Sequence, residues 1–353
     1  MTLFDTVTRH QVHLEQFKSG EINQITAFLQ QVADKLRKEL AGADLTEYSR
    51  AKREKLLKHI QEQLAEIFDE YYDYLAGHLL EFAEIEAAHE VGSLNAVLKP
   101  AGIEVVLPAV EQVKAAIFQD PLAVKGIDGG KLLEPFIRDW QKKDIDMFVG
   151  AIRQGAFEGL TNQEIIRRLI GTKRNRYTDG LLDVSRRHAD AIVRTSIQFV
   201  SGSARMSTWQ ANSDIVSGYR IIATLDSKTT PLCRTLDQQV YEIGKGPLPP
   251  FHVRCRTTTI AELADEFSWL SAGRTRSSMD GYTSGSATYY EWLKTQDKAF
   301  IDGVLGPVRG RLFRDGGMSA THFAKLNLDK SFRQITLDEF KRKVPSAWHQ
   351  AFH

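Results

Sequence analysis

The sequence predicts a predominantly helical α+β protein with three regions: an all-α N-terminal domain (1–182), a small α+β domain (183–264), and a flexible linker with a basic helical C-terminal extension (265–353). Three observations support this fold class. Apolar residues recur at three- and four-residue spacing through the first two hundred residues, β-forming residues gather only between about 217 and 260, and helical spacing returns near 289. A length of 353 residues also favours more than one domain.

The N-terminal region is expected to be a series of amphipathic helices. The range Ile22–Ala41 carries a stripe of apolar residues at helical spacing, and similar stripes predict helices over Tyr48–Tyr72 and Tyr71–Ala88. Thr161, followed three residues later by Glu164, has the pattern of a capping box, in which each side chain accepts a backbone N–H of the other residue. A new helix is therefore predicted to begin at this point.

The second region is expected to join one long helix to a small sheet. The range Arg186–Asn212 has helical character and contains no proline. It is followed by Gly218–Leu225, which is rich in β-forming residues, and the signal returns at Val240–Ile243 and Thr257–Ile260. Turn residues separate these segments, so each is predicted to be a short strand.

The third region begins with Gly273–Ala287, whose Ser, Gly and Thr content predicts a flexible linker. Helical spacing then resumes over Tyr289–Leu305. From Arg274 to the end there are 13 Lys and Arg against 8 Asp and Glu, an excess of 5 positive charges. This bias suits a segment that faces DNA or an acidic protein surface, and an ordinary solvated surface is the alternative.

Composition excludes several other classes of protein. The 46 basic and 45 acidic residues nearly cancel, which argues against wrapping nucleic acid as the main role. No apolar run reaches the ~18–20 residues that cross a bilayer. The N-terminus lacks the cationic and apolar segments of a signal peptide, so folding in the cytoplasm is expected. Two cysteines are too few for a secreted disulfide scaffold.

Four residues carry most of the chemical information: Asp226, Cys233, His252 and Cys255. Cysteine and histidine are preferred zinc ligands, and a His-x-x-Cys turn can present two donors to one ion. Pro249–Pro250 before His252 would stiffen the approach to such a site. The four residues are therefore a candidate site for one structural zinc ion. Packing of thiols and an imidazole in a small core, with no cofactor, is the competing interpretation.

An enzymatic interpretation of the same residues is also open. A zinc ion with one free coordination position could serve a zinc-dependent hydrolase or nuclease, and Glu242 is the one nearby candidate for a general acid or base. Either cysteine, paired with His252, could instead be a nucleophile. The sequence contains neither HExxH nor a His-x-Glu pairing with Pro-Cys-x-x-Cys, so a catalytic role is not expected.

The order of unusual residues resembles the phage Mu protein F-like domain, a family of minor head and head-morphogenesis proteins. The resemblance covers Arg194 to Ala261 and rests on Arg194-Thr195, Gly218-Tyr219, Thr224-Leu225-Asp226, Cys233, Leu236-Asp237 and Pro249-Pro250-x-His252-x-x-Cys255-Arg256. The chain departs from many relatives at Val253, Thr257 and Gln238, where they have proline, a third cysteine and glycine. Because the third cysteine is missing, a metal site here would depend on Asp226 as a ligand, and packing without a metal becomes the stronger alternative. Arg194 and Arg256 are expected to fix the motif by ion pairs or carbonyl contacts.

The resemblance implies a structural role in a virion. Members are minor procapsid components that associate with the portal and act in head assembly, DNA packaging or DNA delivery. The expected partners are therefore the portal protein, the major capsid protein and packaged double-stranded DNA. The expected location is the capsid interior or portal vertex, after assembly in the host cytoplasm. Arg309, Arg311 and Arg314 are expected to contact the phosphates of packaged DNA without recognising its base sequence.

Overall fold

The computed structural model describes residues 3–43, 45, 47–124, 130–271, 275–329 and 333–353. It is 67% helical, with a small sheet region in the middle of the chain and helices at both ends. The predicted α+β, predominantly helical fold class is therefore confirmed. Among the residues described, no helix has both the length and the apolar character that a bilayer span requires.

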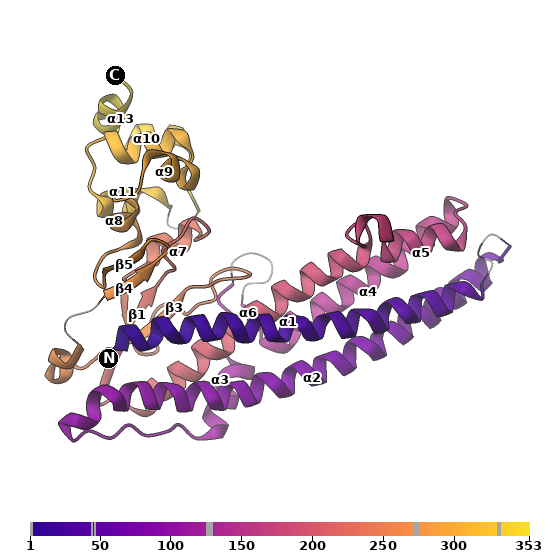
Figure 1. The fold of residues 1–353 in the computed structure, drawn as a ribbon, viewed down its shortest axis with the longest axis horizontal. Helices are drawn as coiled ribbons and strands as arrows, with labels where there is room; N and C mark the ends of the chain where they lie inside the picture. The colour runs from indigo at the N-terminus through magenta and orange to yellow at the C-terminus, as the bar shows by residue number, and fades with distance from the viewer. Residues whose placement is uncertain (1–2, 44, 46, 125–129, 272–274, 330–332) are drawn as a thin grey trace.

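Long helices lying side by side form an elongated N-terminal bundle (Figure 1). Its main members are α1 (Leu3–Ala41), α2 (Arg50–Leu98), α4 (Leu133–Phe157) and α6 (Leu181–Ala211), and α2 packs against the other three. With 39 and 49 residues, α1 and α2 are about 58 and 73 Å long at 1.5 Å per residue. The two helices predicted over Tyr48–Ala88 are in fact one, because the sequence between them contains no helix breaker.

Two shorter helices complete this region: α3 (Val110–Gln119) and α5 (Asn162–Ile170). Short 3-10 turns lie at Lys99–Ala101 and Lys173–Asn175. Helix α5 begins where predicted, because Thr161 and Glu164 form the expected reciprocal capping box.

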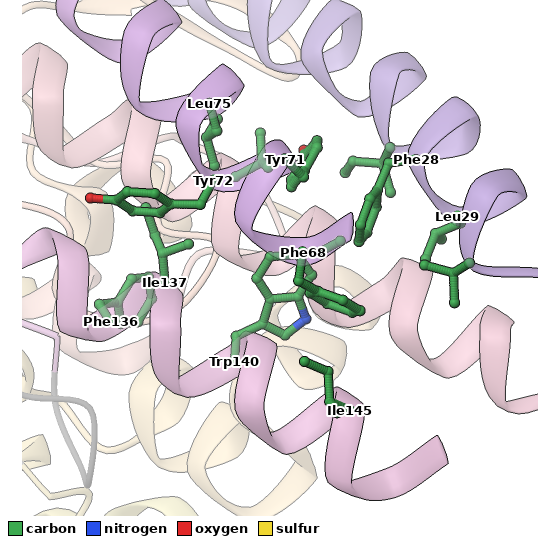
Figure 2. Packing of buried hydrophobic residues seen from close by; sticks show 14 of the residues in the cluster. Phe28, Leu29, Phe68, Tyr71, Tyr72, Leu75, Phe136, Ile137, Trp140 and Ile145 are labelled. Atoms are coloured by element: carbon green, nitrogen blue, oxygen red, sulfur yellow. The ribbon is translucent and has the colours of Figure 1, made fainter. Parts of the chain in front are cut away.

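Aromatic side chains from three helices meet in the core of the bundle (Figure 2). Phe28 of α1 stacks on Tyr71 of α2, with 4.5 Å between ring centroids, and meets Phe68 edge to face at 4.9 Å. Trp140 of α4 lies 5.5 Å from Phe68, and its indole N–H donates to Asp144 at 2.9 Å. All four rings are buried, so this cluster fixes how α1, α2 and α4 pack together.

A three-stranded antiparallel sheet stands at one end of the bundle (Figure 1). Strand β1 (Val216–Ile222) lies between β2 (Val240–Glu242) and β3 (Thr258–Leu263), and the short helix α7 (Pro231–Leu236) connects β1 to β2. Helix α6 contributes to both cores, because its middle packs in the bundle while Trp209, near its end, is buried against the sheet. The sheet is therefore attached to the bundle through α6.

The segment predicted to be a flexible linker forms a hairpin instead. After a 3-10 segment at Asp265–Ser271, β4 (Thr275–Ser278) pairs with β5 (Gly281–Ser284). Gly273 and Arg274 lie outside the described residues. The linker prediction failed because Arg276 is buried in an ion pair with Asp237, a contact between distant positions that local composition does not reveal.

A compact group of helices follows the hairpin, as helical spacing predicted. Within the described residues of this segment, it consists of six short helices: α8 (Tyr289–Leu293), α9 (Lys298–Leu305), α10 (Pro307–Asp315), α11 (Ala320–Asn327), α12 (Leu337–Lys343) and α13 (Pro345–Phe352). Their apolar residues form a third core, to which Leu225 also contributes from the segment after β1. The C-terminal helices are thus packed against the sheet region through their own small core.

Candidate metal centre

Two segments bring a histidine and two cysteines together. Cys233 lies in α7, and His252 and Cys255 lie in the turn that precedes β3. The backbone N–H of Cys255 donates to the carbonyl of His252 at 3.1 Å, which closes the turn. Arg254, between them, has a left-handed backbone (φ 59°), and its N–H donates to Thr195 of α6 at 3.0 Å. The turn is therefore held on the long helix.

We call Cys233, His252 and Cys255 the Cys/His cluster. The Cys233 Sγ lies 3.2 Å from His252 Nε2 and 3.7 Å from Cys255 Sγ, and one donor atom from each residue lies within 4.8 Å of the others. Both cysteines are free thiols and only 1% exposed, whereas His252 is partly exposed. His252 Nδ1 lies 2.9 Å from the carbonyl oxygen of Val253, so Nε2 is the ring nitrogen directed at the sulfur.

The three groups perturb one another's protonation. A hydrogen bond to Cys255, together with burial, raises the pKa of the Cys233 thiol. Burial alone would raise the pKa of Cys255, but hydrogen bonds from Cys233 and His252 bring it well below its ordinary value. Burial opposes the charged form of His252, yet its contact with Cys255 raises the pKa of His252. Cys255 is therefore the more acidic of the two thiols, and its contact with His252 favours the charged form of each partner.

Asp226, the fourth predicted ligand, does not join the cluster. Its carboxylate accepts two hydrogen bonds from Arg256, at 2.6 and 2.9 Å, and one from the backbone N–H of Lys228 at 2.9 Å. Burial opposes ionisation of this carboxyl, but Arg256 holds the pKa of Asp226 below its usual value. The expected structural ion pair of Arg256 is thus confirmed, and it occupies the residue that the sequence assigned to the metal.

A buried lysine lies near the cluster and was not predicted. Lys18 of α1 is 1% exposed and donates to Gln198 of α6 at 2.6 Å and to Glu15 at 2.7 Å. Burial lowers the pKa of Lys18, while Glu15 and then Cys255 act in the opposite direction. Gln198 in turn donates to the carbonyl of Thr257, two residues after Cys255. No local pattern could reveal Lys18, because 237 positions separate it from Cys255.

Asp237 has a larger structural role than its place in the motif suggested. Its fully buried carboxylate receives two hydrogen bonds from Arg276, at 2.8 and 3.1 Å. It also accepts the backbone N–H groups of Ala223 and Tyr289, each at 2.7 Å. One side chain therefore connects the end of β1, the β4–β5 hairpin and the start of α8.

A groove of about 830 Å³ lies between α1 and the sheet region. Its walls come from the first part of α1, the segment after β1, strand β3 and strand β4, and include Val12, Glu15 and Met279. The Asp226–Arg256 ion pair lines the groove, but the residues of the Cys/His cluster do not. The cluster and the groove are thus separate features of the same end of the molecule.

The three arginines predicted to contact DNA lie on α10, and two of them make internal hydrogen bonds. Arg309 donates to the carbonyl of Ile335, and Arg314 pairs with Asp302 of α9. Arg311 is exposed, with its guanidinium 4.9 Å from the centre of the Phe352 ring. Of the three, Arg311 is the most available to a phosphate.

Comparison with known proteins gives one result. Residues 146–260 match the family model described as Phage Mu protein F like protein. The predicted resemblance is therefore confirmed over this segment. No curated protein and no solved structure matches the chain. The matched segment runs from within α4 to within β3, so it contains α6, the central strand and the whole Cys/His cluster.

Proposed function

We propose that this chain, with its Mu protein F-like segment at 146–260, is a minor capsid protein of a tailed phage or prophage. In this proposal it associates with the portal and acts in head assembly, DNA packaging or DNA delivery. Its partners are the portal protein, the major capsid protein and, through phosphates alone, packaged DNA. It is located inside the capsid or at the portal vertex. The family match is the observation that carries the proposal.

The elongated bundle supports an assembly role. Helices α1 and α2 extend about 58 and 73 Å from their residue counts, which gives a long surface for packing on a protein wall. Phe157, at the end of α4, is 91% exposed. A large aromatic side chain in that position is typical of a protein contact surface. We therefore assign the portal or capsid contact to the bundle, with Phe157 in or beside it.

The hydrolase or nuclease alternative receives less support. Glu242, its candidate general acid or base, is 71% exposed and paired with Lys245 on the surface. A substrate would also need access to the cluster, yet both sulfur ligands come from residues that are 1% exposed. We therefore assign no catalytic residue.

The test is co-expression of this chain with the portal and major capsid proteins of the same phage or prophage, followed by purification of procapsids. Wild-type protein should co-purify with the portal and appear in few copies per particle. Phe157→Ser should weaken that association. Tyr282→Ser, which alters an aromatic residue 77% exposed on β5, is the matched control and should not weaken it. Absence of the wild-type chain from both the portal and the particles would contradict the proposal.

A further inference from the structure

We propose that Cys233, His252 and Cys255 bind one zinc ion, and that this ion clips α7 to the turn before β3. The site uses three protein ligands and excludes Asp226. The three residues come from two segments that are joined by strand β2 and a long turn-rich connection. A metal bond between them would therefore restrain that whole connection, and this inference does not depend on the role in head assembly.

The distances between the donor atoms fit a tetrahedral zinc ion. Two thiolate sulfurs, each ~2.3 Å from zinc, lie ~3.8 Å apart at the tetrahedral angle. The two sulfurs here are 3.7 Å apart. A sulfur and an imidazole nitrogen on the same ion lie ~3.6 Å apart, and the observed distance between Cys233 and His252 is 3.2 Å. These two distances differ from the expected values by a few tenths of an ångström at most, and the donor atoms of His252 and Cys255 lie within 4.8 Å of each other.

The histidine is oriented as a zinc ligand would be. A ligating imidazole normally donates its second N–H to a carbonyl or carboxylate, which fixes the tautomer and directs the free nitrogen at the metal. His252 Nδ1 lies 2.9 Å from the carbonyl oxygen of Val253, and Nε2 faces the sulfur of Cys233. The carbonyl of Val253 thus has the role of the outer partner in such a site.

The charge of the site also favours a divalent cation. Two thiols buried to 1% exposure can ionise only if a cation replaces the lost hydration. Zinc, two thiolates and one neutral imidazole sum to zero charge, so the loaded cluster places no net charge in the core. Asp226 is not required for this balance, because Arg256 already neutralises it.

The fourth coordination position belongs to a water molecule. Among the described residues, no fourth histidine, cysteine or carboxylate joins the cluster. His252 is the partly exposed member, so solvent reaches the ion from its side. Three protein ligands with a water are also the arrangement of catalytic zinc sites. The effect of zinc removal on stability therefore separates a structural clip from an exchangeable catalytic ion.

The first experiment measures zinc by mass spectrometry on the full chain, purified under reducing conditions. We expect about one zinc per wild-type chain, as for other sites of this ligand type. Cys255→Ser and His252→Gln should each lower zinc affinity at least about tenfold. His59→Gln is the matched control, because His59 is half exposed on α2 and far in sequence from the cluster. Removal of zinc by a chelator should lower the melting temperature of the wild type and leave that of Cys255→Ser unchanged.

Cobalt substitution keeps the proposal testable if a variant fails to fold. Co²⁺ bound to the wild-type chain should give a thiolate-to-cobalt charge-transfer band in the near ultraviolet, and zinc should displace it. Folded wild-type protein with neither zinc nor this band would overturn the site. Bound zinc whose removal leaves stability unchanged would overturn the clip. A Cys233–Cys255 disulfide, with its sulfurs bonded at ~2.05 Å, that persists in protein purified under reducing conditions would also overturn the proposal.

Discussion

Replacing Arg276 with methionine should destabilise the protein more than any surface change. The Arg276 side chain is 2% exposed and its partner Asp237 is 0% exposed. The substitution keeps most of the volume but removes both hydrogen bonds to the carboxylate, at 2.8 and 3.1 Å. Asp237 would keep only its two backbone donors, from Ala223 and Tyr289. A buried charge without its counter-ion then remains.

The expected cost follows from that stranded charge. Removing one partner of a buried ion pair costs about 3–5 kcal/mol, because the remaining ion has lost both its hydration and its partner. Asp237 also binds the N–H groups of two separate segments. The hairpin, the end of β1 and the start of α8 should therefore loosen together. A second change, Asp237→Asn in the Arg276→Met background, removes the charge, so the double variant should be less destabilised than the sum of the singles by about 1–3 kcal/mol.

Urea unfolding, followed by tryptophan fluorescence and circular dichroism, measures both quantities. Arg256→Met is the matched control, because the Arg256–Asp226 pair is 30% and 20% exposed and should cost about 1 kcal/mol. A loss below about 1 kcal/mol for Arg276→Met would refute the reasoning. Strict additivity in the double variant would show that the two side chains are not energetically coupled.

Three further predictions concern the bundle. Burial lowers the pKa of His89 to about 4. Between about pH 6.5 and 4, His89 is therefore protonated in the unfolded chain but not in the folded one, and the free energy of unfolding decreases as the pH is lowered. The shift corresponds to ~3 kcal/mol, which partial exposure reduces to about 1–2 kcal/mol. In urea unfolding, His89→Gln should therefore reduce the difference in free energy of unfolding between pH 7 and pH 4.5 by that amount. An unchanged difference would refute the prediction. Phe68→Ala should cost about 3–5 kcal/mol in urea unfolding because it empties the centre of the aromatic cluster, whereas exposed Ile85→Ala should cost under about 0.5. Thr161→Ala should cost about 1 kcal/mol in thermal unfolding through loss of the α5 cap, and no change would mean that the cap is replaced by solvent.

The parts of the fold that local sequence controls were predicted, and the parts that depend on distant partners were not. Apolar spacing located the long helices, and the capping pair at Thr161 and Glu164 located the start of α5. The three strands follow runs of β-forming residues. Local composition predicts a linker over Gly273–Ala287 and misses the hairpin there, because the buried partner of Arg276 is 39 positions away. Most of the residues around that arginine are small or polar, and the large side chains of Met279 and Tyr282 are exposed.

The candidate site was predicted in part for the same reason. The spacing of His252 and Cys255 is a local signal, and Cys233 is close enough in sequence to be grouped with them. Asp226 also lies nearby, but Arg256 competes for its carboxylate, and sequence cannot rank two partners for one acid. Lys18 lies near the cluster on the first helix and bonds Gln198 of α6, a position that spacing within one segment could not indicate.

The length of the bundle has a mechanical consequence. Helix α2 is about 73 Å long from its 49 residues, and α6 ties the bundle to the sheet. The molecule is therefore shaped as a lever, with the sheet and its Cys/His cluster at one end and the tips of α4 and α5 toward the other (Figure 1). A tilt of about 5° at the sheet would move the far tip of α2 by about 6 Å, slightly more than one helical turn. Any contact made at that tip would be sensitive to small rotations at the opposite end.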